Sequence, residues 1–368
     1  MIDSTISTER MTRLQTHLAQ AKIDLLAIAP TVNMQYLLGF TPHADERPTY
    51  LLVTPEAVAL VVPSLNADQV EQHTGRTTIR WADATGPKAA LVSALAELRV
   101  KPNGVLAVDD SMRADYLILL QTMARPATSL ASTDLMARLR MRKSAQELAW
   151  LAQAAALTDR AVLAGAEACR PGVSEREVAA EIDRFYRTNG AELVDFMLVA
   201  AGPNGAFPHH HSGDHKLQPG EPIIMDIGAT LNGYKSDVTR VVQLGQPSQE
   251  VQQVYDLVRA ANAAGRAAVK PGVPVRDIDR ATRSVIEAGG YGDYFFHRTG
   301  HGLGLEVHEP PSITSENEML LEPGMVFSVE PGIYLNGKFG IRIEDIVTVT
   351  ETGGQTLTGL SHDLIIKA

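Results

Sequence analysis

The chain has 368 residues, 45% hydrophobic and 21% charged, a composition typical of a globular protein with about two domains. Its formal net charge of −10 argues against a nucleic-acid-binding surface, which requires an excess of basic residues. The N-terminal MIDSTISTER lacks the pattern of a secretory signal and no apolar run could span a membrane, so we expect a cytoplasmic protein that binds neither membrane nor nucleic acid.

The only cysteine, Cys169, cannot form a disulfide within one chain, so nothing in the sequence requires an oxidising compartment. It lies in an alanine-rich segment of helical character with no catalytic motif around it. We therefore expect a buried structural residue and not a nucleophile.

Helical and extended patterns alternate along the N-terminal part of the chain. Hydrophobic spacing predicts helices over residues 8–23 and 88–98. Runs of aliphatic residues predict strands at 24–29, 50–53, 58–62 and 104–108. This alternation predicts an α/β domain over residues 1–132. The small polar residues at 128–134 are typical of a domain boundary, so a second domain is expected over residues 136–368.

The second domain begins with a long predicted helix. Ser144 and Glu147 form a capping-box pattern at the start of a helical segment that reaches about residue 167. Hydrophobic spacing predicts further helices over 174–188, 250–269 and 276–288. The remaining segments are β-rich and carry nearly all of the candidate functional residues.

Residues 222–244, PIIMDIGATLNGYKSDVTRVVQL, predict a β-hairpin around Asn232-Gly233. Asn-Gly favours a type I′ turn, in which both central residues need positive φ. A two-residue loop places Asp226 opposite Thr239. Asp226 and Asp237 are then diagonal neighbours on one face of the hairpin.

Two carboxylates at that spacing can reach two metal ions about 3.5–4 Å apart. Without a cation they would repel each other and lose hydration, at a cost of roughly several kcal/mol. The alternative is that both aspartates face solvent. The strongly apolar neighbours argue against it: Ile223, Ile224, Met225, Ile227, Val238, Val241 and Val242.

Residues 325–350 repeat this design, with Glu330 before Asn336-Gly337 and Glu344 after it. The repetition predicts a pseudo-repeat in which four acids meet between two related halves. The alternative for Glu344 is a surface salt bridge with Arg342.

The second hairpin does not match a two-residue loop. Such a loop would pair Glu344 with Val329 and place Glu330 on the opposite face. A bulge or a longer loop would restore the match, and Pro331-Gly332 and Phe339-Gly340 are its predicted places.

Histidines gather in the glycine-rich segment 296–311, FHRTGHGLGLEVHEPP. The glycines flanking His301 allow close backbone approach, so His301 is a candidate metal ligand and His308 a second functional candidate. The pattern leaves open whether His297 is structural or functional. In the run Pro208–His211, we expect one of the three histidines to belong to the site.

Four carboxylates and one imidazole suit Mn²⁺, Zn²⁺, Co²⁺ or Fe²⁺, whereas an all-oxygen magnesium site would need no imidazole. The sequence therefore predicts a two-metal hydrolase. Its candidate metal ligands are Asp226, Asp237, His301, Glu330 and Glu344.

The segments MDIGA, YKSDVTR, HRTGHGLGLEVHEPP, FSVEPGIY and GIRIEDIVTVT, spread over residues 225–350, resemble the creatinase/aminopeptidase family of pita-bread metallopeptidases. The similarity is greatest to Xaa-Pro dipeptidases (prolidases) and Xaa-Pro aminopeptidases. It implies an α+β fold, with a pita-bread domain of pseudo-twofold symmetry over 136–368 and a creatinase-type α/β domain over 1–132. It also implies a homodimer that cleaves proline-containing di- or oligopeptides.

The resemblance implies two divalent metal ions, with Mn²⁺ as the expected ion. Asp226 would bind one ion, His301 and Glu330 the other, and Asp237 and Glu344 both. A water molecule between the ions would lose a proton and attack the carbonyl before proline.

Further roles follow from the same resemblance. Glu330 would shuttle the proton. His308 would stabilise the oxyanion or bind the scissile carbonyl. His209 would contact the substrate or its leaving amine, and Arg342 would orient Glu344 or contact the substrate.

One position departs from the family pattern. Some prolidases carry an arginine four residues after the equivalent of His308, where it can hold the free C-terminus of the substrate, and this chain has Ser312. The serine favours an aminopeptidase unless a basic residue such as His210, His215 or Lys216 substitutes.

Two other classes of function compete with the peptidase. One is a small-molecule hydrolase or lyase of the same fold, similar to creatinase or ectoine hydrolase, and the other is an inactive binding module. Creatinase lacks the full ligand set and an inactive module has usually lost a ligand, whereas all five positions are filled here. Methionine aminopeptidase is a weaker candidate because it normally lacks a large N-terminal domain.

Overall fold

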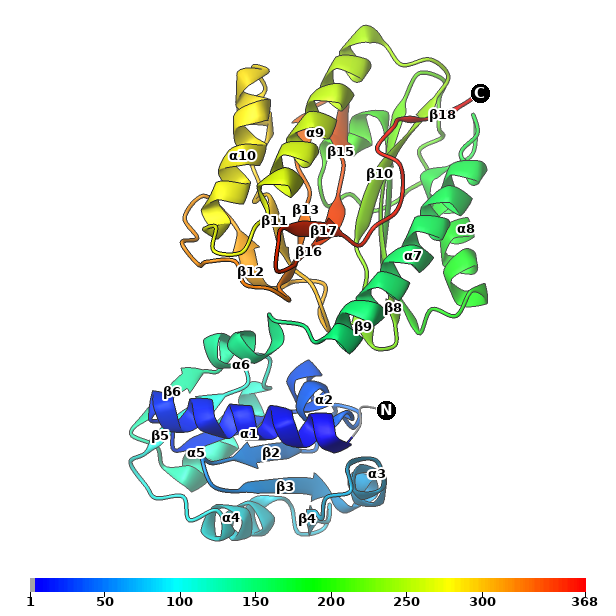
Figure 1. Cartoon of the computed structure of the whole chain (residues 1–368). Helices are drawn as coiled ribbons and strands as arrows, with labels where there is room; N and C mark the ends of the chain where they lie inside the picture. Colours follow the sequence, from blue (N-terminus) through cyan, green and yellow to red (C-terminus); the bar gives the residue numbers. More distant parts are fainter. Residues whose placement is uncertain (1–3) are drawn as a thin grey trace. The chain divides into compact units, whose positions relative to one another are not determined.

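Figure 1 shows the computed structural model of the chain, which describes residues 4–368. Their contacts divide the chain into two compact units, one ending at Arg140 and the other beginning at Met141. Within the described residues, every helix is too short or too polar to cross a membrane.

The first unit is built on a six-stranded mixed sheet in the order β4-β3-β2-β1-β5-β6. Its strands are β1 (Leu25–Ile28), β2 (Tyr50–Val53), β3 (Val58–Pro63), β4 (Ile79–Trp81), β5 (Val105–Val108) and β6 (Thr128–Ala131). Its helices are α1 (Ser4–Ala21), α2 (Val32–Leu38), α3 (Ser64–Thr74), α4 (Lys88–Glu97), α5 (Ala114–Ala124) and α6 (Thr133–Arg140). The predicted α/β architecture is confirmed.

The polar segment at residues 128–134, which the sequence suggested as a boundary, lies within the first unit, which ends at Arg140. It forms β6, whose four residues are exposed, and the start of α6. Small polar residues suit this place because β6 is the edge strand of the sheet and pairs with β5 alone. Leu139 and Arg140 of α6 bond to other parts of the unit, to Tyr36 and Asn33 respectively.

The second unit holds two five-stranded sheets and a separate hairpin. One sheet contains β7 (Leu193–Ala201), β8 (Pro222–Leu231), β9 (Tyr234–Lys235), β10 (Val238–Leu244) and β18 (Ile365–Lys367). The other contains β11 (Gly300–Gly302), β12 (Glu309–Ile313), β13 (Val326–Val329), β16 (Asp345–Val349) and β17 (Gly354–Thr356). The hairpin is β14 (Gly332–Leu335) with β15 (Phe339–Arg342).

Two helix pairs cover the strands of this unit: α7 (Ala145–Ala168) with α8 (Glu175–Thr188), and α9 (Gln249–Ala268) with α10 (Val275–Ala288). The capping box of Ser144 and Glu147 is present at the start of α7. Cys169 ends α7 and is fully buried, as predicted. Two short 3-10 helices, η1 (Gly202–Ala206) and η2 (Gly292–Tyr294), complete the unit.

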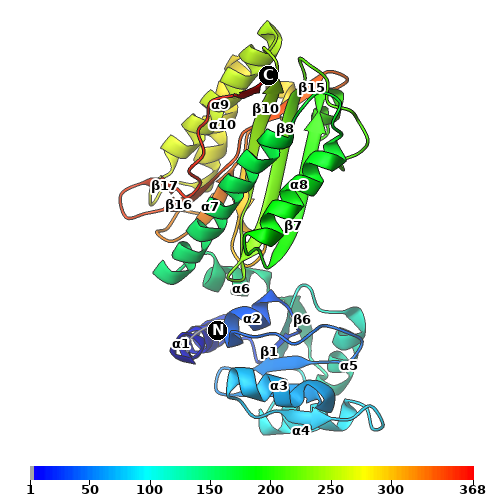
Figure 2. The same cartoon turned by 90° about the vertical axis from the view of Figure 1, so that its right-hand side faces the viewer.

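Strand β8 is apolar on both faces because each face packs against other elements. Alternate residues from Ile223 to Ile227 pack against α7 and α8, which Figure 2 shows in green lying across the sheet. Ile224 belongs to a different core, built with α9 and β15. Asp226 shares the face of Ile224 and is therefore directed away from α7 and α8.

The two helix pairs belong to the internal repeat that the acidic residues of the two hairpins predict. Gly172 and Gly272 both have positive φ (84° and 79°) and occupy the same place after α7 and after α9. The amide of Gly172 donates to Leu217 O (2.9 Å), and that of Gly272 donates to Leu321 O (2.8 Å). The pseudo-twofold architecture is thus visible in the helix connections as well as in the hairpins.

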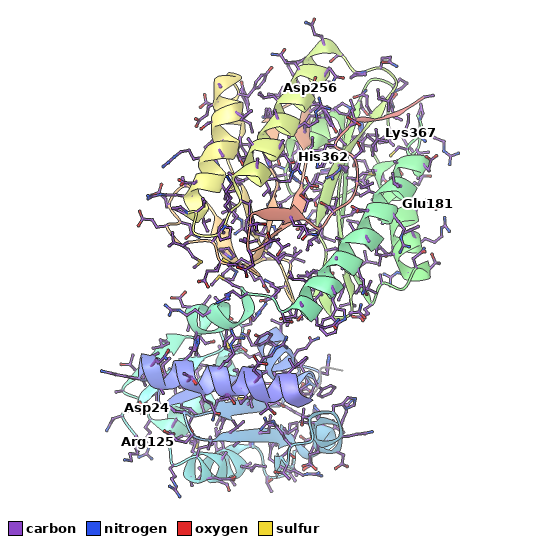
Figure 3. All side chains as sticks on the ribbon, in the orientation of Figure 1. Asp24, Arg125, Glu181, Asp256, His362 and Lys367 are labelled. Carbon is purple, nitrogen blue, oxygen red and sulfur yellow. The ribbon has the colours of Figure 1, made fainter. Side chains whose placement is uncertain are left out.

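A buried ionic network ties β10 to β16 beside the candidate site. Arg240, almost fully buried, donates to Asp345 Oδ1 (2.8 Å) and to the carbonyl of Glu344 (2.6 Å). His362, labelled in Figure 3, places Nε2 2.7 Å from Asp345 Oδ2. Burial opposes ionisation of Asp345, but His362 and Arg240 hold its pKa below the ordinary value. This network fixes the backbone that carries Glu344.

Candidate metal centre

The first hairpin has the predicted turn and register. Asn232 and Gly233 have φ values of 54° and 77°, as a type I′ turn requires. Asp226 lies opposite Thr239 in the ladder of β8 and β10. The predicted pairing is therefore confirmed.

The second hairpin has a loop of three residues, 336–338. Leu335 pairs with Phe339, and the amide of Lys338 donates to Leu335 O (2.9 Å). Gly337 has φ 74°, whereas Asn336 keeps a negative φ. The extra residue thus lies in the turn and not at the two predicted bulge positions, because the register is unbroken along β14 and β15.

The longer loop brings the two glutamates together. Val329 pairs with Asp345 in the ladder of β13 and β16, which continues the register of the hairpin. That register places Glu330 directly opposite Glu344. The alternative of a surface salt bridge between Glu344 and Arg342 is wrong, since Glu344 is 1% exposed and accepts from Thr239 instead.

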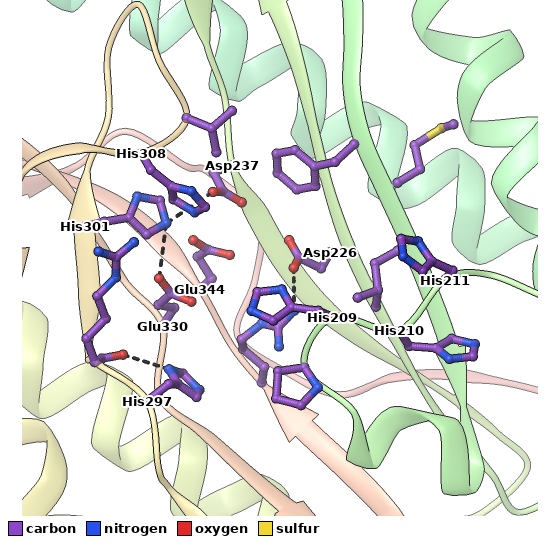
Figure 4. A pocket seen from close by; sticks show the side chains of 17 residues that line it. His209, His210, His211, Asp226, Asp237, His297, His301, His308, Glu330 and Glu344 are labelled. Atoms are coloured by element: carbon purple, nitrogen blue, oxygen red, sulfur yellow. Dashed lines mark hydrogen bonds and ion pairs between the residues drawn. The ribbon is translucent and has the colours of Figure 1, made fainter. Parts of the chain in front are cut away.

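All five candidate ligands line one cavity of about 720 Å³ in the second unit (Figure 4). His301 Nε2 lies 3.2 Å from Glu330 Oε1 and 3.6 Å from Asp237 Oδ2. Ligand atoms of Asp237, His301 and Glu344 lie within 4.8 Å of one another. Asp226 borders the same cavity from β8.

The acids of this cluster resist ionisation in the absence of a cation. Burial raises the pKa of Asp237 and of Glu344 well above the ordinary values, and repulsion from the neighbouring carboxylates adds to it. Burial also raises the pKa of Glu330, to about 7. A bound cation would favour the ionised form of these carboxyl groups, because it would offset both the burial and the mutual repulsion.

His301 is prepared to act as a neutral nitrogen ligand. Burial lowers its pKa to about 3, so the ring is uncharged at neutral pH. Its Nδ1 lies 3.1 Å from Gly302 O, and a carbonyl oxygen can only accept, so Nδ1 carries the proton. The unprotonated Nε2 then faces Glu330 and Asp237.

The glycines around His301 allow neighbouring strands to come unusually close. A Cβ on Gly300 would lie 1.9 Å from Ser328 O, and a Cβ on Gly302 would lie 2.2 Å from Pro310 O. Both obstacles are backbone atoms, which cannot turn aside. The glycines therefore serve the packing of β11 between β12 and β13, and this packing positions the imidazole.

Two carboxylate oxygens in the cluster are buried without a hydrogen-bond partner among the described residues. They are Asp226 Oδ1 and Glu344 Oε1. Buried polar atoms are almost always satisfied, and an unsatisfied carboxylate oxygen is a natural cation ligand. Together with the neutral imidazole and the raised carboxyl pKa values, these atoms fit a site for divalent metal ions of the borderline class.

Arg342 and Thr239 link the acids of the two hairpins. Arg342 donates to Asp226 Oδ2, to the hydroxyl of Tyr334 (2.8 Å) and to Thr239 Oγ1 (3.2 Å). Thr239 in turn donates to Glu344 Oε2 (2.7 Å). Arg342 therefore reaches Glu344 only through the threonine, and its ion pair is with Asp226.

The remaining histidines differ in their surroundings. His308 lies edge-on to His301 with ring centroids 4.2 Å apart, and burial, then the charge of Arg298, lower its pKa. Burial also lowers the pKa of His297 to about 4, and its Nε2 lies 3.0 Å from the hydroxyl of Tyr334. Both rings are thus neutral polar groups in the cavity wall.

All three histidines of the run after η1 line the cavity. His210 is held by Glu175, whose carboxylate lies 2.8 Å from Nε2. His209 is exposed and lies on the Asp226 side of the cavity in Figure 4. His209 is therefore the member of the run that is best placed to meet a substrate.

Of the three basic residues suggested as substitutes for an arginine at Ser312, two lie outside the cavity wall. His215 pairs with Glu221, and Lys216 pairs with Glu177. His210 lines the cavity but is held by Glu175. The cavity is also lined by Arg298, to which the sequence analysis assigned no role. The sequence feature that could have identified Arg298 is its position in the motif HRTGH, three residues before His301.

Comparison with known proteins agrees with this geometry. Residues 149–351 match the model of metallopeptidase family M24, and residues 10–142 match the creatinase/prolidase N-terminal domain. The chain is 37% identical to the probable dipeptidase PepE of Mycobacterium bovis, over 99% of this chain and 97% of the relative. It is 31% identical to the Xaa-Pro dipeptidase of Pyrococcus furiosus, over 97% and 99% respectively.

Solved structures show the same similarity. The recombinant prolidase of Thermococcus sibiricus superimposes with a TM-score of 0.93 at 35% identity, and all of both chains is covered. Since the family model spans more than half of the chain and the relatives align over nearly all of it, this protein belongs to metallopeptidase family M24 and carries a creatinase/prolidase N-terminal domain.

Proposed function

We propose that this metallopeptidase is an Xaa-Pro dipeptidase that depends on two divalent metal ions. The observation that carries the proposal is the cluster of four acids and one neutral imidazole around a cavity, with two buried carboxylate oxygens that lack a partner among the described residues. The names of the relatives support the choice of substrate, since they include an Xaa-Pro dipeptidase and a prolidase.

In this proposal Asp226, Asp237, His301, Glu330 and Glu344 hold the metal ions, with Mn²⁺ as the expected pair. The chemistry supplied by two such ions is Lewis acidity, which lowers the pKa of water and polarises a carbonyl oxygen. The homodimer and the cytoplasmic location belong to the same proposal. Metal analysis of the native protein and light scattering test the ion and the dimer.

The side chains around the ligands have separate tasks. Glu330 holds and returns the proton taken from the attacking water, and Ser328 Oγ, 3.0 Å from Oε1, fixes its carboxylate. His308, neutral because of burial, donates a hydrogen bond to the oxygen of the scissile carbonyl. His209 contacts the substrate beside the leaving amine. Arg342 positions Asp226 through their ion pair.

The substrate is tested with metal-loaded protein on Ala-Pro, Gly-Pro and Ala-Pro-Ala. We expect cleavage of the two dipeptides and little cleavage of the tripeptide. Rapid cleavage of the tripeptide would identify an aminopeptidase instead. If fully metal-loaded protein hydrolyses none of the three, the peptidase proposal is refuted and a small-molecule hydrolase of the same fold takes its place.

The ligand set is tested with Asp237→Asn. The neutral amide cannot replace a buried anionic ligand, so we expect loss of bound metal and of activity while the fold persists. Asp183→Asn is the control, because Asp183 only pairs with Arg187 on the exposed face of α8. A variant at Asp237 that keeps full metal content and activity would show that the ligand set is wrong.

A further inference from the structure

The cavity is lined by two permanently charged cations, and only one of them is neutralised within the described residues. Arg342 forms an ion pair with Asp226 and two further hydrogen bonds. Arg298 has one hydrogen bond from its guanidinium, from Nη1 to Ser312 Oγ (3.2 Å), and lies in no salt bridge of the described residues. Since a guanidinium carries five N–H donors, most of those of Arg298 remain available to a ligand.

Arg298 lies close to the candidate metal ligands. Ser312, which its guanidinium contacts, is directly opposite His301 in the ladder of β11 and β12. The charge of Arg298 contributes to lowering the pKa of His308, after the larger effect of burial. It also opposes the burial-driven rise in the pKa of Glu330. A cation at this place thus faces the region where a peptide bond would be cleaved.

The other basic groups in the cavity wall are less suited to hold an anion. His301 is one of the proposed metal ligands, and Nε2 of His297 lies 3.0 Å from the hydroxyl of Tyr334. His210 is held by Glu175. Arg298 is therefore the permanent charge in the wall that is available to a negatively charged group of a substrate.

We infer that Arg298 binds the C-terminal carboxylate of a dipeptide substrate and so makes the site selective for dipeptides. The inference rests on the proposed peptidase function. A guanidinium can hold a carboxylate with two parallel hydrogen bonds, which fixes both charge and orientation. In a tripeptide or a dipeptide amide, the carboxylate after the second residue is replaced by a neutral amide, and this interaction is lost.

The test compares Ala-Pro with its C-terminal amide, Ala-Pro-NH₂, as substrates of wild-type protein, Arg298→Ala and Arg298→Lys. For Arg298→Ala we expect a loss of about 10- to 100-fold in kcat/KM on Ala-Pro, mainly through KM, because a charge-assisted hydrogen bond is removed. On the amide we expect a change of less than about threefold. Arg298→Lys keeps the charge but not the two-pronged geometry and should be intermediate.

Inhibition by the product provides a readout that does not depend on turnover of the variant substrate. L-proline should inhibit hydrolysis of Ala-Pro-NH₂ less strongly in Arg298→Ala than in wild type, whereas inhibition by L-prolinamide should not change. The double variant Arg298→Ala/Ser312→Arg moves the guanidinium to the neighbouring strand and should recover part of the preference for Ala-Pro. Arg280→Ala, an exposed arginine of α10 that pairs with Asp277, is the control.

The outcomes separate the two claims. If wild-type protein hydrolyses neither Ala-Pro nor its amide, the proposed function fails, and this inference fails with it. If wild-type protein hydrolyses both and Arg298→Ala weakens both equally, the inference alone is overturned. Unchanged metal content and thermal melting of the variants exclude a general structural effect.

Discussion

Thr239→Val tests how the side chains around the proposed metal ligands hold Glu344 in place. The substitution keeps the size of the side chain and removes one hydroxyl. That hydroxyl is fully buried, accepts from Arg342 Nε (3.2 Å) and donates to Glu344 Oε2 (2.7 Å). Since Glu344 Oε1 already lacks a partner among the described residues, valine leaves this carboxylate without a side-chain donor there.

The size of the effect follows from the lost hydrogen bond. A hydrogen bond to a charged group contributes about 1.5–3 kcal/mol. Loss of a group that orients a metal ligand typically weakens metal binding about 10- to 100-fold, which is about 1.4–2.8 kcal/mol. The two estimates agree, so we expect Thr239→Val to bind Mn²⁺ about 10- to 100-fold more weakly than wild type.

Titration calorimetry of the metal-free protein with Mn²⁺ measures this change. Thr239→Ser keeps the hydroxyl and should stay within about threefold of wild type. Thr348→Val is the matched control, because Thr348 is also buried but its hydroxyl has no hydrogen-bond partner among the described residues. If Thr239→Val binds Mn²⁺ as tightly as wild type, or Thr348→Val loses as much affinity, the reasoning is refuted.

Three further predictions concern stability. In the metal-free protein the pKa of Glu330 is raised from 4.5 to about 7, so the folded metal-free protein loses stability as the pH rises from 4.5 to about 7. The increase in melting temperature on metal loading should therefore grow with pH over this range, and an increase that does not change with pH would contradict the prediction. Gly300→Ala places a Cβ 1.9 Å from Ser328 O and should lower the free energy of unfolding, measured with denaturant, by more than about 2 kcal/mol. Gly353→Ala, whose Cβ would have its nearest atom at 3.8 Å, should be near neutral, and equal unfolding free energies for the two variants would count against the steric argument. Arg240→Ala removes one buried partner of Asp345 but leaves His362 and Thr358 bonded to that carboxylate, so it should destabilise the protein by about 1–3 kcal/mol in the same assay. Unchanged stability would be inconsistent with the network.

Short sequence motifs were sufficient to predict the first hairpin and the start of the long helix α7. The turn at Asn232-Gly233 set the pairing of Asp226 with Thr239, and the structure has that pairing. The capping box at Ser144 marked the start of α7. These features depend on hydrogen bonds between residues close in sequence, so a short stretch of chain contains the information that determines them.

The second hairpin shows where local rules end. Asn336-Gly337 resembles the first turn, yet Asn336 keeps a negative φ and the loop takes a third residue. Neighbouring strands decide this outcome, since β13 and β16 extend the same ladder and Glu330 and Glu344 both face the cavity. A one-residue shift would reverse the face of each side chain, and only tertiary packing selects against it.

The sequence also did not predict which basic residue is available to a substrate in the cavity. His215, Lys216 and Arg298 are all basic residue types, but carboxylates pair with the first two: Glu221 with His215, and Glu177 with Lys216. Arg298 lies on the cavity wall with no such carboxylate among the described residues. The carboxylate that pairs with a basic residue lies more than five residues away in the sequence. Hydrophobic periodicity does not predict such pairs.

By itself, the sequence determined which residue types are available for chemistry: the five candidate ligands, the glycines around His301 and the motifs that resemble a metallopeptidase family. Only the tertiary structure decided that these acids meet, although Asp226 and Glu344 lie on different hairpins far apart in the chain. It also decided that burial raises the carboxyl pKa of Glu344 and that one oxygen each of Asp226 and Glu344 is buried without a donor among the described residues. The physical reason is that desolvation and charge repulsion depend on distances through space, and these exist only after the two halves of the unit have packed together.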